Sequence, residues 1–163
     1  MRVLIIEDEM GALDDLRSIL AESAPDIRIA GTTESVMQSV AWLEKNPVPD
    51  LIFMDIHLSD GSAFEIFRRT AVEAPVIFTT AYDEYAIHAF RVNAVDYLLK
   101  PLNTDDVRRA LAKLRRLTST ERSDYGSRVR TMAVRRHEDV FLVHVRDRII
   151  PLRREQIAFC YTF

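Results

Sequence analysis

The 163-residue chain has few of the residues that mark special structural classes. It contains one cysteine, Cys160, so no disulfide forms within the chain, and we expect this side chain to pack as a small apolar group. Four glycines and six prolines exclude a collagen-like or low-complexity chain. No apolar run approaches the ~20 residues needed to cross a bilayer, and no charged segment precedes an apolar one at the N-terminus. These absences predict a cytoplasmic protein with no membrane segment.

The net charge changes sign along the chain. Residues 1–117 carry 13 basic and 19 acidic side chains, a net charge of −6, whereas residues 118–163 carry 9 basic and 6 acidic side chains, a net charge of +3. This reversal suggests two functional units, of which the second faces a polyanion. A short basic tail that is merely solvated explains the charge equally well.

Short apolar runs alternate with amphipathic segments over the first 117 residues, which is typical of a parallel sheet covered by helices on both faces. We expect strands at residues 3–6, 27–30, 51–54, 76–79 and 97–99. We expect helices at residues 10–22, after a cap at Ser35, at residues 63–71 and 85–92, and after a cap at Thr104. Five such units predict an α/β fold with a flavodoxin-like, doubly wound (βα)5 parallel sheet.

The remaining residues have a different pattern. Residues 118–136 are polar and aperiodic, which predicts a linker. Residues 140–145 and 148–152 predict a β-hairpin, and residues 157–163 predict a further strand. Such a short β fragment cannot bury a core of its own. We expect it either to begin a larger β domain or to pack on the first unit.

Acidic residues follow two of the expected strands. Glu7, Asp8 and Glu9 come after the first strand, and Asp55 comes after the third. In a doubly wound sheet the carboxyl ends of neighbouring strands meet where the strand order reverses, so we expect these side chains to converge. Carboxylates this close repel one another unless a divalent cation lies among them, and hard oxygen ligands favour Mg²⁺.

Two further polar residues follow the fourth and fifth strands, Thr80 and Lys100. A cation that draws in a phosphoryl donor allows Asp55 to act as a nucleophile. The Lys100 ammonium can pair with one phosphoryl oxygen, and the Thr80 hydroxyl can hydrogen-bond another. An isolated strand-end aspartate is more often a solvated residue, but four such positions with suitable residue types favour formation of an aspartyl phosphate.

Four motifs resemble the receiver domain of two-component response regulators. They are Ile-Ile-Glu-Asp-Glu (5–9), Phe-Met-Asp-Ile-His-Leu-Ser-Asp-Gly (53–61), Phe-Thr-Thr-Ala-Tyr (78–82) and Asp-Tyr-Leu-Leu-Lys-Pro (96–101). Residues 81–101 resemble the LytTR (LytR/AlgR) subgroup, and residues 141–152 resemble the opening strands of a LytTR DNA-binding domain. The resemblance implies a receiver domain at 1–117, a linker at 118–136 and an incomplete LytTR domain at 137–163.

The resemblance implies how the phosphoryl group is held and sensed. Asp55 is the expected phosphoacceptor and Lys100 the counter-ion of the phosphate. Thr80 is the expected switch hydroxyl, and Tyr97 is the aromatic side chain coupled to it. A cis peptide is expected between Lys100 and Pro101, since the tertiary amide lowers the cost of the cis form.

The resemblance also implies a Mg²⁺ site. Asp8 is the expected direct ligand, Asp55 and the backbone carbonyl of His57 are further expected ligands, and Glu7 is expected to act through a water. Many receivers carry a proline where this chain has Ser59, so we expect the turn to depend on Asp60 and Gly61 instead.

By resemblance the protein is a phosphorylation switch that regulates transcription. It is not an enzyme acting on other substrates, although it catalyses its own phosphorylation and dephosphorylation. The expected partners are a sensor histidine kinase, a second copy bound through the face formed by the fourth helix, the fifth strand and the fifth helix of the expected fold (residues 85–90, 93–98 and 104–117), and, in a full-length protein only, promoter DNA.

Three other classes of protein share some of these features. A haloacid-dehalogenase-type phosphatase has a second aspartate two residues after the nucleophile, where this chain has His57. A flavodoxin-like cofactor binder needs a loop rich in Gly, Ser or Thr after the first strand, where Glu-Asp-Glu repels phosphate. A receiver-like module that no longer accepts phosphate is disfavoured only because every required side chain is present.

Overall fold

The computed structural model describes residues 1–81, 94–116, 140–145 and 148–153. Its strands are β1 (Arg2–Ile6), β2 (Arg28–Thr33), β3 (Leu51–Asp55), β4 (His57–Leu58), β5 (Gly61–Ser62), β6 (Val76–Thr80), β7 (Asp96–Leu99), β8 (Val140–Val145) and β9 (Arg148–Arg153). Its helices are α1 (Met10–Ser23), α2 (Val36–Lys45), α3 (Phe64–Arg69) and α5 (Thr104–Arg116). The helix expected at 85–92 lies outside the described residues.

Five strands form one sheet in the order β2-β1-β3-β6-β7, and every neighbouring pair is parallel. This is the flavodoxin-like arrangement that the sequence predicts. The strand order reverses between β1 and β3, so the residues that follow these two strands lie side by side at the carboxyl edge of the sheet.

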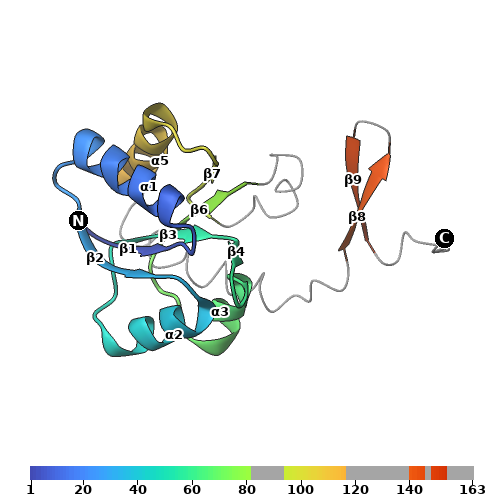
Figure 1. Ribbon diagram of the computed structural model, residues 1–163, viewed down its shortest axis with the longest axis horizontal. Coiled ribbons are helices and arrows are strands. Elements are labelled where there is room, and N and C mark those ends of the chain that lie inside the picture. The colour runs from blue at the N-terminus through green and yellow to red at the C-terminus, as the bar shows by residue number, and fades with distance from the viewer. Residues whose placement is uncertain (82–93, 117–139, 146–147, 154–163) are drawn as a thin grey trace.

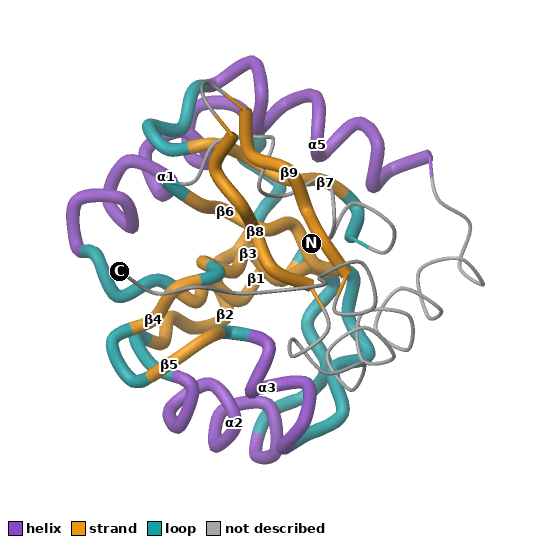
Figure 2. Tube along the Cα trace, turned by 90° about the vertical axis from the view of Figure 1, so that its right-hand side faces the viewer, coloured by secondary structure: helices purple, strands orange, loops and turns teal. Residues whose placement is uncertain are grey.

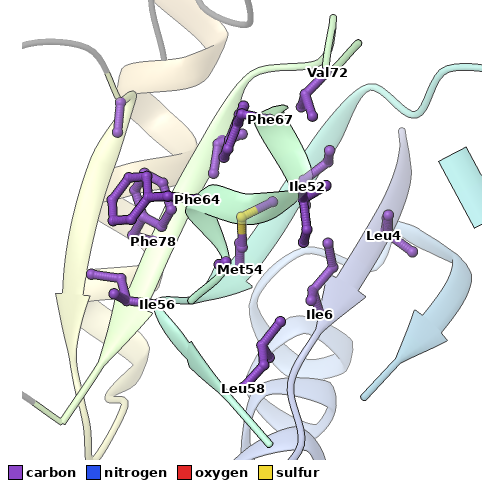
Figure 3. Close-up of a cluster of buried hydrophobic side chains, with 14 of the residues drawn as sticks. Leu4, Ile6, Ile52, Met54, Ile56, Leu58, Phe64, Phe67, Val72 and Phe78 are labelled. Carbon is purple, nitrogen blue, oxygen red and sulfur yellow. The ribbon is translucent and has the colours of Figure 1, made fainter. Parts of the chain in front are cut away.

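Helices cover both faces of the sheet, with α1 and α5 on one face and α2 and α3 on the other (Figures 1 and 2). Because strand side chains alternate between faces, β1 sends Val3 and Ile5 toward the α1 and α5 side and Leu4 and Ile6 toward the α2 and α3 side. Figure 3 shows the buried cluster on the α2 and α3 side, in which apolar side chains from the sheet pack against α3. Each fully buried large apolar side chain contributes about 1.5–3 kcal/mol.

The predicted segment boundaries hold to within one residue for β1, β3, β6 and β7. The last helix begins differently, because its cap is Asn103 and not Thr104. The Asn103 side-chain oxygen accepts a hydrogen bond from the Asp106 N–H at 2.9 Å, and its amide donates to the Asp106 carboxylate at 2.5 Å. An amide side chain satisfies the free N–H groups of a first helical turn as well as a hydroxyl does. Ser35 caps α2 as predicted, since its side chain accepts from the Gln38 N–H.

The second strand is longer than predicted and continues through Gly31 to Thr33. Its pairing with β1 shifts register beside Gly31, which indicates a bulge at this edge of the sheet. The indole of Trp42 lies over the glycine: a Cβ built there would lie 2.3 Å from Trp42 Nε1. Glycine is therefore required here to admit an aromatic side chain, not to break the strand.

The C-terminal hairpin forms as predicted. Strands β8 and β9 pair antiparallel, from Val140 with Arg153 to Val145 with Arg148. The expected linker at 118–136 and the further strand at 157–163 lie outside the described residues. Within the part of the chain that the structure describes, none of the helices has the length and apolar character needed to cross a membrane.

We predict that Gly31→Ala lowers the free energy of unfolding by about 1–3 kcal/mol, because the added methyl overlaps the Trp42 ring. A double-mutant cycle of Gly31→Ala and Trp42→Ala, measured by urea unfolding, tests whether this overlap is the cause. Gly31→Ala should lower the free energy of unfolding much less in a Trp42→Ala background. Gly11→Ala is the matched control: a Cβ at Gly11 meets no atom within 4 Å, so this change in α1 should be neutral or stabilising. If Gly31→Ala lowers the free energy of unfolding equally in both backgrounds, overlap with the Trp42 ring is not the cause.

Candidate functional site

Three carboxylates meet at the carboxyl edge of the sheet. Glu7 and Asp8 follow β1, Asp55 ends β3, and one oxygen from each carboxylate lies within 4.8 Å of the others. Glu7 and Asp55 are buried, whereas Asp8 is exposed. The parallel pairing of β1 and β3 brings together residues that are almost fifty positions apart in the sequence.

Lys100 joins this cluster from the end of β7. Its ammonium Nζ donates a hydrogen bond to Asp55 Oδ2 at 2.5 Å and another to Glu7 Oε1 at 2.7 Å. Glu9 Oε2 lies farther away, at 3.8 Å. The Lys100 side chain is only 12% exposed, so both hydrogen bonds form largely out of contact with water. The Lys100-Pro101 peptide is cis, as predicted.

Burial and charge act in opposite directions on these groups. Burial raises the pKa of the Glu7 carboxyl, as does the charge of Asp55, and the hydrogen bond from Lys100 offsets this only in part. Burial acts to lower the pKa of the Lys100 ammonium, but its hydrogen bonds to Asp55 and Glu7 outweigh burial and raise it. The single ammonium is bonded to two of the three clustered carboxylates, so negative charge remains in excess.

The donor set fits a hard divalent cation. Carboxylate oxygens are ligands that Mg²⁺ prefers, and a cation beside Glu7, Asp8 and Asp55 would offset the excess negative charge. The loop that follows Asp55 also orients this carboxylate, because the His57 N–H donates to Asp55 Oδ1 at 3.1 Å. His57 itself lies in β4, two residues after Asp55, with an exposed side chain.

The two predicted switch residues lie on neighbouring strands. Thr80 ends β6, is 1% exposed, and its carbonyl accepts a hydrogen bond from the Lys100 N–H at 2.7 Å. Tyr97 in β7 is half-buried and stacks on Phe78 of β6, with ring centroids 5.3 Å apart and planes 19° apart. The end of β6 therefore contacts Lys100 through its backbone and Tyr97 through an aromatic pair.

The sequence predicts only a turn at Asp60, but in the structure its side chain also bonds to α2. Its carboxylate accepts hydrogen bonds from the N–H groups of Val36 at 2.7 Å and Met37 at 3.1 Å, in the first turn of α2. Although burial acts to raise the pKa of the Asp60 carboxyl, these N–H groups outweigh it and lower the pKa. Gly61 has a φ of 142°, a conformation that favours glycine, so the turn depends on Gly61 as expected, whereas the Asp60 side chain bonds to α2.

A buried hydroxyl pair next to the site also has no signal in the sequence. Thr33 Oγ1 and Ser39 Oγ lie 2.7 Å apart and link the end of β2 to α2. The Thr33 carbonyl accepts a hydrogen bond from the Glu7 N–H at 2.9 Å, so this link reaches the backbone of the acidic cluster. Two isolated hydroxyl residues in a polar stretch do not reveal such a contact.

A family model and several curated proteins match this chain, and they agree on the kind of protein it is similar to. The family model described as the response regulator receiver domain matches residues 3–112. The sensory transduction protein LytT of Bacillus anthracis is 32% identical over 158 residues, which cover 90% of this chain and 63% of that protein. LytT of Enterococcus faecalis is 30% identical over 99% of this chain and 72% of its own length. The transcriptional regulatory protein BtsR of Escherichia coli K12 is 37% identical over 74% of this chain and 51% of its own length.

Solved structures agree with the fold. The response regulatory domain of mrkE from Klebsiella pneumoniae superposes with a TM-score of 0.60 at 29% identity, covering 71% of this chain and 95% of that one. The receiver domain of PhyR from Erythrobacter litoralis gives a TM-score of 0.58 at 32% identity, covering 72% and 92%. The chain spans less than two thirds of the length of the Bacillus anthracis protein. With the matched family model, these results show that the chain belongs to the response regulators and carries their receiver domain at residues 3–112.

Proposed function

We propose that Asp55 accepts a phosphoryl group from a sensor histidine kinase, and that this controls transcription through a DNA-binding domain of the LytTR type. The observation that carries the proposal is the pair of hydrogen bonds from the Lys100 ammonium to Asp55 and Glu7, inside a cluster of three carboxylates. The likeness to LytT over nearly the whole chain supports the output that we propose.

The chemistry follows from the positions of these side chains. An oxygen of the Asp55 carboxylate attacks phosphorus, the P–N bond of the kinase phosphohistidine breaks, and the imidazole leaves with its electron pair. The His57 N–H holds Asp55 Oδ1, which fixes the orientation of the nucleophile. The Lys100 ammonium, already at Asp55 Oδ2, pairs with a phosphoryl oxygen as charge develops.

Mg²⁺ is the metal that we propose for this site. Glu7, Asp8, Asp55 and the His57 backbone carbonyl would hold it, and it would supply a positive charge that offsets the phosphoryl oxygens. Attack of water on the aspartyl phosphate later releases inorganic phosphate and restores the carboxylate. The protein thus catalyses its own phosphorylation and dephosphorylation and turns over no other substrate.

The signal would pass from the phosphate to the face of β7 and α5. Phosphorylation adds a charge of about −2 at Asp55. The Thr80 hydroxyl would donate a hydrogen bond to one of the phosphoryl oxygens. Thr80 is bonded to the Lys100 backbone, so its movement also shifts β7, where Tyr97 lies. We propose that two copies associate through residues 85–90, β7 and α5.

The remaining assignments complete this proposal. Residues 1–117 form the receiver domain, residues 118–136 a linker, and residues 137–163 the first strands of a LytTR DNA-binding domain, of which β8 and β9 are the described part. Promoter DNA is then a partner only of a chain with the complete domain. A kinase donor and a DNA target place the protein in the cytoplasm.

We predict that acetyl phosphate with Mg²⁺ adds one phosphoryl group to the protein and that Asp55→Asn abolishes this addition, as measured by intact mass. Asp26→Asn is the matched control, because Asp26 is exposed and pairs with Arg115 away from the site. Equal phosphorylation of the Asp55→Asn variant would overturn the assignment of the acceptor.

We predict that Mg²⁺ raises the thermal unfolding midpoint, because a ligand that binds only the folded state stabilises it, by about 2.7 kcal/mol at 100 times the Kd. Asp8→Asn should weaken Mg²⁺ binding and raise the midpoint without metal, since it removes one of three crowded negative charges. Asp14→Asn, in the exposed part of α1, is the control and should leave the Mg²⁺ effect unchanged. Unchanged Mg²⁺ affinity in Asp8→Asn would rule out this ligand.

We predict that the beryllofluoride complex sediments as a dimer and that Arg109→Glu keeps it monomeric. Arg109 is 63% exposed and lies on α5 beside Asp96 of β7, so the reversed charge is placed on the proposed interface. Arg28→Glu, on the opposite edge of the sheet, is the control and should dimerise normally. A dimer of Arg109→Glu with unchanged affinity would place the interface elsewhere.

A further inference from the structure

The loop that follows the acceptor aspartate is a small hairpin. After Asp55, strands β4 and β5 pair antiparallel, with His57 opposite Ser62 and Leu58 opposite Gly61. The base of the hairpin is fixed, because the Ala63 N–H donates to the Ile56 carbonyl at 2.9 Å and Leu58 is buried in the core (Figure 3). Its tip contains Ser59 and Asp60, both exposed, so other contacts must hold the tip in place.

The tip is bonded to the start of α2, more than twenty residues earlier in the sequence. Both oxygens of the Asp60 carboxylate are used, Oδ1 by the Val36 N–H and Oδ2 by the Met37 N–H. The Ser59 hydroxyl adds a hydrogen bond to the Glu34 carbonyl at 3.3 Å. The first N–H groups of a helix have no partner within the helix and favour a negative charge, so this carboxylate is well placed.

Ser35 and Asp60 accept hydrogen bonds from different N–H groups in the first turn of α2. The Ser35 side chain accepts from the Gln38 N–H at 3.2 Å, and the Ser35 carbonyl accepts from the Ser39 N–H at 3.0 Å. Asp60 serves the two remaining N–H groups, those of Val36 and Met37. Ser35 therefore caps the helix from within its own segment, whereas Asp60 caps it from the acceptor loop and joins the two.

The same turn of α2 is connected to the other half of the acidic cluster. Ser39 Oγ donates to the Ser35 carbonyl at 2.7 Å and lies 2.7 Å from Thr33 Oγ1. The Thr33 carbonyl accepts from the Glu7 N–H. The start of α2 is thus linked to Glu7 through Thr33 of β2 on one side, and on the other it contacts the loop that follows Asp55 directly.

We propose that Asp60 is a positioning residue: it holds the loop of Asp55 and His57 against α2 and thereby sets the affinity of the acidic cluster for Mg²⁺. This inference rests on the proposed function. Mg²⁺ demands near-octahedral geometry with little tolerance, so a loop that supplies ligands must be fixed before the ion binds. Residues that orient the ligands of a metal without touching the metal commonly change its affinity 10- to 100-fold.

The test is Mg²⁺ titration by calorimetry on the full chain, with acetyl phosphate kinetics as a second measurement. Asp60→Ala should weaken Mg²⁺ binding about tenfold or more. It should slow phosphorylation at low Mg²⁺ but leave the rate at saturating Mg²⁺ within about twofold of the unmodified protein, since no group that contacts the phosphate is lost. Asp60→Asn retains one of the two oxygen acceptors, so it should restore only part of the affinity and fall between Asp60→Ala and the unmodified protein.

Ser35→Ala is the matched control. It removes a cap from the same helical turn without touching the acceptor loop, so it should lower the thermal midpoint but leave Mg²⁺ affinity unchanged. Unchanged affinity in Asp60→Ala, or an equal loss in Ser35→Ala, would overturn the proposal. Far-ultraviolet circular dichroism checks that each variant is folded. If the unmodified protein neither binds Mg²⁺ nor accepts phosphate, the proposed function itself fails, and this result is distinguishable from a failure of Asp60 alone.

Discussion

The hydrogen bonds from Lys100 to Asp55 and Glu7 are the interaction on which the site depends. Burying a charge is costly unless it is paired, and breaking a buried pair commonly costs about 3–5 kcal/mol. Here the ammonium stabilises two buried carboxylates but leaves the acidic cluster with excess negative charge. The fold therefore holds a site that is stable enough to form and still favours binding of a further cation. A dianionic phosphoryl group can enter only when such positive charge is available.

The parallel sheet makes this arrangement possible, because it brings the ends of β1, β3 and β7 to one edge. In β1, β3 and β6 the apolar side chains are buried on both faces of the sheet, so the core fixes the backbone at Glu7, Asp55 and Thr80. The loops that follow the strands are less well supported by packing and depend on polar contacts with α2. The start of this helix bonds directly to the exposed turn that follows Asp55 and is linked to Glu7 through Thr33, so a packed element supports both segments.

The sequence predicts those parts of the molecule that depend on local pattern. Continuous apolar runs such as those of β1 and β3 allow only a sheet covered on both faces, and strand-end acids then converge through topology alone. Contacts between distant polar groups leave no such pattern. The bonds from Asp60 to α2, the pairing of Thr33 with Ser39 and the Trp42 ring over Gly31 each depend on two segments meeting in space. The cap at Asn103 was wrongly placed at Thr104, because adjacent residues of similar capping strength differ only in the geometry of the turn.

A crystal structure of the protein with Mg²⁺ and beryllofluoride is the most direct test of the central claim. The account predicts beryllium bonded to an Asp55 carboxylate oxygen, Mg²⁺ beside Glu7, Asp8 and Asp55, and the Lys100 ammonium turned from Glu7 to a fluorine atom. Beryllofluoride on a different carboxylate, or a Lys100 ammonium that stays bonded to both Asp55 and Glu7 with no beryllium at Asp55, would contradict it.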